Sequence, residues 1–315
     1  MDAATAFAGK KILITGAGGF VGGHLANWLA RIPCTLALAG RGAPRPADPA
    51  DVAAISWHAK DTTTAEFRET MVAGNFDTIF HFAGNTSVPL SVAQPTMDFQ
   101  QNCVATVEIL EALRTSGSDA VFVYASSAAV YGNPARLPIA EADPTTPISP
   151  YGVSKLAAES YVSAYCRHYG LRGSSLRIFN PFGPGFRKLV VYDLARKALR
   201  GPELEVIGDG SQARDFLYID DLVSAILHVA AFAPHDGGAY NLGSGIATAT
   251  SEIAEQLVEI VNPDLPIRYN EARTAGSPEQ WCADIGKLRA LGWAPKVSLA
   301  EGLARTAQWI MHEDS

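Results

Sequence analysis

Short apolar runs alternate with longer stretches of mixed polarity through the first 180 residues of the chain. The runs at residues 11–15, 35–39, 77–82, 120–124 and 175–179 have the length and continuous apolar character of buried strands. Apolar positions spaced three and four residues apart predict helices over residues 20–31, 97–115 and 153–169. Strands that alternate with helices predict a parallel sheet covered on both faces.

This rhythm becomes less regular after residue 180, where Pro181, Gly183, Pro184 and Gly185 predict a loop that leaves the sheet. Residues 217–219 and 239–242 are expected to return to the main sheet, and two helical stretches follow from about residue 251. The pattern therefore predicts an α/β fold: a Rossmann-like, doubly wound parallel sheet with a smaller lobe built from discontinuous segments. We assign residues 1–180 and 216–247 to the sheet domain, and residues 181–215 and 248–315 to the lobe.

Composition narrows the class of protein. Of the 315 residues, 48% are hydrophobic and 18% are charged, so a large core is expected rather than disorder. The net charge of −7 disfavours nucleic-acid binding, which requires a basic surface. The first ten residues do not resemble a signal peptide, and no stretch approaches the ~20 apolar residues of a membrane span, so no membrane partner is expected. Four separated cysteines suggest neither a zinc site nor a redox pair, so we expect no metal and a reducing, cytoplasmic setting.

The first strand is followed at once by Gly16, Gly19 and Gly22, which open the first long helix. A strand, a glycine turn and a helix in this order are typical of dinucleotide binding, because the turn must be tight and its backbone must approach a pyrophosphate. The N–H groups at the start of the helix then bind the phosphate charge.

The end of the second strand indicates which dinucleotide is bound. An acidic residue there binds the ribose of NAD, whereas an arginine accommodates the phosphate of NADP. This chain has Gly40 and Arg41, with Arg45 nearby and no carboxylate. The segment favours NADP over NAD, unless both arginines are ordinary solvated charges.

Tyr151 and Lys155 are four residues apart and share one face of a predicted helix that begins near Pro150. We expect the ammonium to lower the pKa of the phenol, so that Tyr151 exchanges a proton with a hydroxyl or carbonyl near neutral pH. Ser127, at the end of an earlier strand, is positioned to polarise the same oxygen. The three residues predict acid–base chemistry beside a bound nicotinamide.

With these motifs, the chain resembles the extended short-chain dehydrogenase/reductase superfamily, in the branch of nucleotide-sugar epimerases, dehydratases, decarboxylases and reductases. The matching segments are residues 15–22, 81–84, 126–132, 151–155, 177–181, 214–221 and 291–295. The resemblance implies that Tyr151 is the catalytic acid and base, that Lys155 binds the nicotinamide ribose and that Ser127 aids proton transfer. It also implies that the sheet domain binds the dinucleotide and the lobe a nucleotide sugar.

Further roles follow from the resemblance alone. Asp61 corresponds to a position that contacts adenine, and Asn102 to a structural asparagine. The other residues implied in the dinucleotide site are Phe20, Val21, Phe82, Ala83, Gly84, Ser126 and Phe179. Asn180, Arg214 and Arg273 correspond to residues that bind the diphosphate of the sugar nucleotide, and Val190 and Val191 to positions near its base. For Arg214 the alternative is an ion pair with Asp215 or Asp220.

The reaction type is narrowed by residues 127–129, which read Ser-Ala-Ala. Related dehydratases carry an acid–base pair here and decarboxylases a glutamate, so both reactions are disfavoured. The string resembles the 4-epimerases, which oxidise the sugar transiently to a 4-keto form. An NADPH-dependent 4-keto-sugar reductase is the alternative, and a 3,5-epimerase or a non-catalytic dinucleotide sensor ranks lower.

The resemblance also implies a homodimer that pairs two helices of each subunit in a four-helix bundle. The helices are those predicted over residues 97–115 and 153–169. Tyr161, Val162 and Tyr165 are the expected contact residues.

Overall fold

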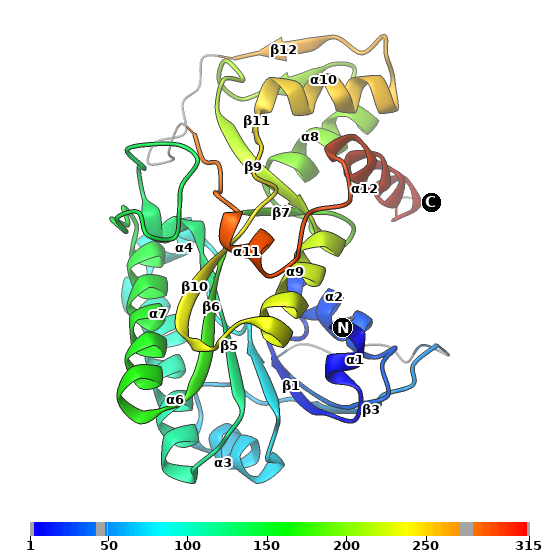
Figure 1. Cartoon of the computed structure of the whole chain (residues 1–315). Coiled ribbons are helices and arrows are strands. Elements are labelled where there is room, and N and C mark those ends of the chain that lie inside the picture. Colours follow the sequence, from blue (N-terminus) through cyan, green and yellow to red (C-terminus); the bar gives the residue numbers. More distant parts are fainter. Residues whose placement is uncertain (1–2, 42–47, 49, 271–279, 314–315) are drawn as a thin grey trace.

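The computed structural model of the chain describes residues 3–41, 48, 50–270 and 280–313. Within these residues, seven parallel strands form the central sheet in the order β10-β6-β5-β4-β1-β2-β3 (Figure 1). They are β1 (Lys11–Thr15), β2 (Thr35–Ala39), β3 (Ala54–His58), β4 (Thr78–His81), β5 (Val121–Ser127), β6 (Arg172–Ile178) and β10 (Asp236–Leu242). The chain runs outward from β1 to β3 and then returns to β4 on the other side, which confirms the doubly wound α/β fold.

Helices cover both faces of this sheet (Figure 1). One face carries α1 (Ala3–Phe7), α2 (Phe20–Leu29) and α9 (Ile219–Phe232), and the other carries α3 (Ala65–Gly74), α6 (Ala105–Ser116) and α7 (Pro150–Tyr169). Alternate residues of a strand serve the two cores: Ile12 and Ile14 pack with Leu25 on the first face, and Leu13 packs with Phe67 on the second.

The helical stretch before α6 begins earlier than expected. It consists of α4 (Val88–Ala93), α5 (Pro95–Phe99) and η1 (Gln100–Val104), which is one turn of π-helix. The helix predicted over residues 97–115 is therefore present, but with a π turn inside it. This turn holds the buried Asn102.

The smaller lobe lies beyond the carboxyl ends of the main strands (Figure 1). Its three-stranded sheet has the order β11-β9-β7, and β12 pairs with β8 in a second, two-stranded sheet. The strands are β7 (Asn180–Phe182), β8 (Leu204–Val206), β9 (Ala213–Tyr218), β11 (Ala247–Ala249) and β12 (Ile267–Tyr269). The remaining helices are η2 (Ala128–Tyr131), α8 (Leu189–Arg200), α10 (Thr250–Val261), α11 (Gly286–Ala290) and α12 (Leu299–Glu313).

One strand prediction is wrong, and one strand was missed. Residues 217–219 do not return to the main sheet: β9 pairs with β7 and β11 in the lobe, and α9 begins at Ile219. Strand β3 was not expected, because as an edge strand with largely exposed residues it carries no continuous apolar run. The return predicted over residues 239–242 is confirmed by β10, which pairs with β6.

The segment that leads from β7 into the lobe lies against the first turn of α2. The rings of Phe20 and Phe186 are stacked with centroids 4.5 Å apart. One turn later, His24 Nε2 is 2.9 Å from the carbonyl oxygen of Pro184. These contacts join residues about 160 positions apart and place the segment over the glycine turn.

Candidate functional site

The glycine turn joins β1 to α2 at the carboxyl edge of the main sheet. Gly16 has φ of +69°, and a Cβ there would lie 2.6 Å from the carbonyl carbon of Phe82. A Cβ on Gly22 would lie 2.4 Å from the carbonyl oxygen of Gly16. Both positions therefore require glycine, because backbone occupies the space of any side chain.

These residues fit the pyrophosphate of a dinucleotide. Gly19 precedes α2, and no side chain caps the first N–H groups of that helix. Phe20 and Val21 form its first turn and are only partly buried. The start of α2 therefore offers backbone donors and the positive end of a helix dipole to an anion.

The residues predicted at the adenosine end of the dinucleotide lie in the loops after β2 and β3. Arg41 is exposed and close enough to Asp61 to contribute to lowering its pKa, although the main cause is a hydrogen bond from the Thr63 backbone. A Cβ on Gly40 would meet no atom nearer than 3.5 Å, so a side chain would fit there. Arg45 lies outside the described residues.

Residues after β4 form the floor beside the glycine turn. Phe82 N–H donates to the Thr15 carbonyl, and Ala83 N–H donates to the Thr15 hydroxyl at 3.1 Å. A Cβ on Gly84 would lie 2.3 Å from the side-chain oxygen of Asn102, so glycine allows the two residues to approach this closely. Burial lowers the pKa of His81 to about 3, and the Lys155 ammonium adds to this, so the imidazole is neutral.

The structure brings Tyr151, Lys155 and Ser127 together. Helix α7 begins at Pro150, and the Ser149 hydroxyl caps it by accepting a 3.1 Å hydrogen bond from Gly152 N–H. The side chain of Ser127, the last residue of β5, lies close enough to the Tyr151 phenol to act on its pKa. Lys155 Nζ donates to the Ala125 carbonyl at 2.9 Å and lies 5.9 Å from the centre of the Tyr151 ring.

The expected effect of Lys155 on Tyr151 is wrong. Burial raises the pKa of Tyr151 above its ordinary value, and only the influence of the nearby Ser127 side chain opposes this. Burial also lowers the pKa of Lys155 to about 8, against the attraction of Asp98. Because both groups are almost completely covered, desolvation exceeds their mutual interaction.

A buried polar cluster supports α7 from below, and sequence reasoning assigned a role only to its Asn102. The carboxylate of Asp98 accepts hydrogen bonds from Asn85 at 2.7 Å, Asn102 at 3.0 Å and Ser154 at 2.6 Å. Asn102 also donates to Ser154, which confirms its structural position. Asp98 and Asn102 are four residues apart, so their spacing was the available signal.

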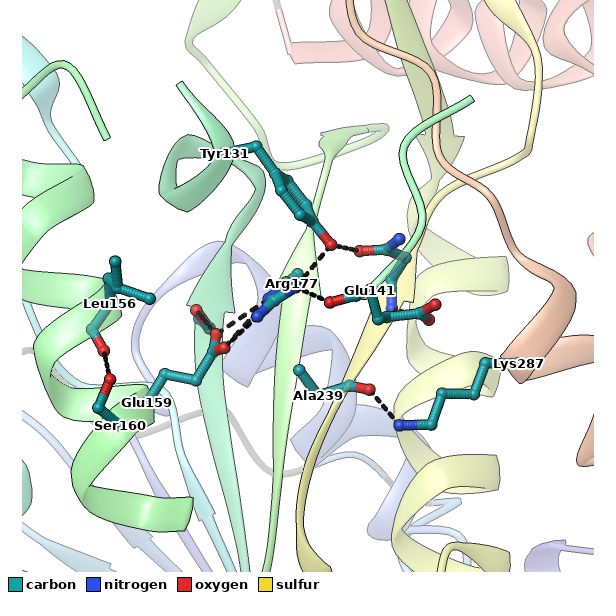
Figure 2. A network of polar contacts seen from close by, with 10 residues as sticks. Tyr131, Glu141, Leu156, Glu159, Ser160, Arg177, Ala239 and Lys287 are labelled. Carbon is teal, nitrogen blue, oxygen red and sulfur yellow. Dashed lines mark hydrogen bonds and ion pairs between the residues drawn. The ribbon is translucent and has the colours of Figure 1, made fainter. Parts of the chain in front are cut away.

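A second buried network lies one turn further along α7 (Figure 2). The Ser126 hydroxyl donates to Glu159 at 2.8 Å, and Glu159 forms an ion pair with Arg177. Ser126 was expected to contact the dinucleotide, but its hydroxyl is engaged here. Sequence reasoning assigned no role to Glu159 or Arg177, although Arg177 lies in a matching segment.

The residues predicted to bind the sugar nucleotide lie in the lobe, and Phe179, predicted in the dinucleotide site, lies between β6 and β7. Phe179 is buried, and Asn180 donates to the Asp215 carbonyl at 3.2 Å. Arg214 donates to the Ala213 carbonyl at 2.9 Å and lies 5.7 Å from the Trp281 ring. Val190 and Val191 lie in the first turn of α8, and Val191 is buried, so its side chain faces the core. Arg273 lies outside the described residues.

The two carboxylates considered as partners of Arg214 have other contacts. Asp215 accepts hydrogen bonds from the backbone of Ser244, Gly245 and Ala283. Asp220 pairs with Arg305 at 3.2 Å.

Metal ligation and membrane insertion find no support in the described part of the chain. Across the described ranges, no three His, Cys, Asp or Glu side chains gather as metal ligands. No helix in those ranges combines the length and apolar content needed to span a membrane.

Known proteins resemble this chain over nearly its whole length. The profile of the NAD dependent epimerase/dehydratase family matches residues 12–243. The UDP-glucose 4-epimerase of Mycolicibacterium smegmatis is 31% identical over 96% of this chain and 99% of its own. The crystal structure of UDP-glucose 4-epimerase from Thermotoga maritima, with UDP-glucose, has a TM-score of 0.87 and 29% identity, covering 97% of this chain and 100% of that one. The complex of Thermus thermophilus UDP-glucose 4-epimerase with NAD has a TM-score of 0.84 and 29% identity, covering 96% of this chain and 99% of that one.

Proposed function

We propose, on the premise that this chain belongs to the NAD dependent epimerase/dehydratase family, that it inverts C4 of a sugar carried on a nucleotide diphosphate. The observation that carries the proposal is the grouping of three side chains: Tyr151 and Lys155 lie one turn apart on α7, Lys155 donates to Ala125 of β5, and Ser127 ends that strand. These groups lie at the same sheet edge as the glycine turn. A phenol placed beside a dinucleotide site is suited to moving the proton of a sugar hydroxyl.

The dinucleotide would be held by the turn at Gly16, Gly19 and Gly22, and by Lys155 at the nicotinamide ribose. When bound, it supplies the acceptor and later the donor of a hydride at C4. We propose NADP as the preferred form, because Gly40 and Arg41 replace the acid expected for NAD. NAD is the alternative, because the related UDP-glucose 4-epimerase of Thermus thermophilus was crystallised with NAD.

Tyr151 is protonated at neutral pH in this structure, because burial raises the pKa of its phenol. To accept the C4 hydroxyl proton it requires further stabilisation of the phenolate. The Ser127 side chain acts in that direction, and a positively charged nicotinamide would do so when bound. Ser127 is also the hydroxyl able to reach the same substrate oxygen.

Residues 127–129 favour epimerisation over dehydration. Ala128 follows Ser127 and is completely buried, and Ala129 is only partly buried. Neither methyl group donates or accepts a proton, so the acid and base needed to remove water are missing from these positions.

A reductase of nucleotide 4-keto-sugars is the second candidate. Gly40 and Arg41 favour it, because a reductase consumes NADPH. It uses the same Tyr151, Lys155 and Ser127, with a proton donated to the keto oxygen and not returned.

The sugar nucleotide is proposed to bind between the main sheet and the lobe. Asn180 and Arg214 lie on adjacent strands of the three-stranded sheet, and the guanidinium of Arg214 lies near the Trp281 ring. Arg273, which lies outside the described residues, is also proposed to bind the diphosphate. A uridine diphosphate sugar is the first substrate to test, since relatives bear that name.

Domain roles, assembly and compartment are also proposals. We assign dinucleotide binding to residues 1–180 and 216–247, and sugar-nucleotide binding to residues 181–215 and 248–315; β9 crosses the boundary at residue 216. We propose a homodimer through α6 and α7. The four buried free cysteines support a reducing, cytoplasmic setting.

A panel of uridine, guanosine, cytidine and thymidine diphosphate sugars tests the function. We expect one sugar to be converted to its C4 epimer with no net change in nicotinamide absorbance. Stoichiometric loss of NADPH absorbance with a keto-sugar indicates the reductase instead. Tyr151→Phe is expected to lower kcat by a factor of about 10³ while dinucleotide affinity is kept. Full activity in Tyr151→Phe would contradict both candidates.

A further inference from the structure

Helix α7 contacts the end of β5 through three successive turns. Tyr151, Lys155 and Glu159 are spaced by four residues and form one stripe on the helix. Tyr151 lies near the Ser127 side chain, Lys155 donates to the carbonyl of Ala125, and Glu159 accepts from the hydroxyl of Ser126. The first two contacts involve the proposed reacting groups, and the third has no part in the reaction.

The third contact is the one that carries a buried charge. The side chains of Glu159 and Arg177 are only 9% and 8% exposed. Arg177 Nε donates to the two carboxylate oxygens of Glu159 at 3.1 and 3.2 Å, and Nη2 donates to one of them as well. A carboxylate that is removed from water requires such a partner, so Glu159 is fixed by Arg177.

Arg177 is itself held from its other side (Figure 2). Its Nη1 donates to the Tyr131 hydroxyl at 2.7 Å and to the Glu141 carbonyl oxygen at 2.9 Å. The Tyr131 hydroxyl donates to Asn241 Oδ1 at 2.6 Å. The guanidinium therefore has partners on α7, on η2 and on the loop that precedes α7, and its position is fixed by three parts of the chain.

The register of the sheet places this pair beside the reacting groups. Ser126 of β5 is directly paired with Arg177 of β6, and Ser127 is the next residue. A rotation or slide of α7 on the sheet would separate Tyr151 from Ser127, and it would also break the contacts of Glu159 with Ser126 and Arg177. The ion pair thus resists the movement that would misplace the phenol.

We propose that Glu159 and Arg177 are positioning residues for the reaction: their buried ion pair fixes α7 against β5 so that Tyr151 stays beside Ser127. This inference rests on the proposed function. Replacing a buried ion pair by apolar residues of similar size often leaves stability unchanged, so the requirement for the pair is geometric. A displacement of about 1 Å of a reacting group is enough to lower a rate about 100-fold.

The main variant is the double substitution Glu159→Leu with Arg177→Met, which leaves no unpaired charge. We expect it to fold, to bind the dinucleotide within about threefold of the native affinity and to keep its KM. Its kcat is expected to fall by a factor of about 30 to 100. The matched control is Arg68→Met with Glu108→Leu, which removes a 2.6 Å ion pair between α3 and α6. That control is expected to keep native kcat.

The pH dependence separates positioning from stability. The nearby Ser127 side chain lowers the pKa of Tyr151, so separating the two groups raises that pKa. We expect the acidic limb of the rate profile to move to higher pH in the double variant. Arg177→Lys keeps the positive charge and one donor nitrogen. It is expected to show a smaller fall in kcat and a smaller shift of the acidic limb.

A titration without substrate makes the test independent of the proposed reaction. Tyrosine labelled with ¹³C at the ring carbon bearing the hydroxyl, assigned by Tyr151→Phe, reports the pKa of Tyr151 by NMR. A higher Tyr151 pKa in the double variant supports the inference even if no sugar nucleotide is turned over. An unchanged Tyr151 pKa with native kcat in the folded double variant overturns it. If the double variant does not fold, Glu159→Gln and Arg177→Lys are measured in the same way, and native values in both overturn it.

Discussion

Lys155 is a residue whose ammonium group is almost fully buried, and its environment changes its ionisation. Burial lowers its pKa to about 8 from 10.5. Between these two pH values the unfolded chain therefore holds more of the proton than the folded chain does. The cost of burying the charge is fully present below about pH 8 and decreases as the pH rises toward about 10.5, so the Lys155 contribution makes the free energy of unfolding rise over that range.

Lys155→Met removes this contribution. The free energy of unfolding of the variant minus that of the native protein is expected to decrease by about 2 kcal/mol as the pH rises from about 7 to about 9.5. Denaturant unfolding at several pH values measures the difference. Lys197→Met is the control, because that ammonium is paired with Asp193 at 3.0 Å on a helix surface. A pH-independent difference for Lys155→Met would show that the folded ammonium keeps its ordinary pKa.

Single residues were predictable from the sequence where a motif assigns them. Tyr151, Lys155 and Ser127 were placed together correctly, since the spacing of four residues and the strand end determine their positions. The direction of the Tyr151 pKa was not predictable, because it depends on how completely α7 is covered. Glu159 and Arg177 are 18 residues apart on different elements, so neither spacing nor polarity indicates that they form an ion pair.

At the scale of elements, the turn between β1 and α2 depends on a close backbone contact. Gly22→Ala places a methyl group 2.4 Å from the Gly16 carbonyl oxygen, so the turn must open. We expect dinucleotide affinity to fall by a factor of at least about 30, because the N–H groups that face the phosphates move. Isothermal titration calorimetry with NADPH and NADH measures the loss.

Gly23→Ala is the matched control on the same helix. Its methyl group would meet only the carbonyl oxygen of Ala17, at 3.4 Å, which is an ordinary contact. Alanine also favours the helix by up to about 1 kcal/mol, so affinity is expected to stay native and stability to hold or rise. Equal losses of affinity in both variants would contradict the role of the close contact.

Elements were predicted well where their burial is uniform. Strands β1, β2 and β4 are apolar because both faces are covered, and each lies where its apolar run predicted it. Strand β3 was missed because it lies at the exposed edge. Strand β9 was assigned to the wrong sheet, because its apolar residues can be buried equally well in the small sheet. There, Leu217 pairs with Pro181 of β7.

At the scale of the whole molecule, the outer face of α7 carries exposed aromatic side chains. Tyr161 is 46% exposed and Tyr169 is 56% exposed, which supports the proposed pairing of α6 and α7 between two subunits. Val162 was also expected in this interface, and that expectation is wrong: it is completely buried against the sheet. Tyr165 is partly buried, and its hydroxyl donates to Glu111 at 3.1 Å.

Tyr161→Glu tests the proposed dimer. A carboxylate in the centre of an apolar interface is expected to weaken dimerisation by a factor of about 100 or more, measured by sedimentation velocity. Tyr269→Glu is the control, because Tyr269 is 40% exposed on β12, far from α7. Native oligomers in both variants would show that the subunits associate elsewhere or not at all.

The stacked rings of Phe20 and Phe186 have a consequence for the order of binding events. Phe186 belongs to the segment that leads into the lobe, and Phe20 begins the helix proposed to bind the pyrophosphate. A lobe movement that parts the two rings would therefore also uncover the proposed dinucleotide site. A closed lobe would hinder exchange of the dinucleotide during turnover, which suits the proposed epimerase, because it reuses one nicotinamide for both halves of its cycle.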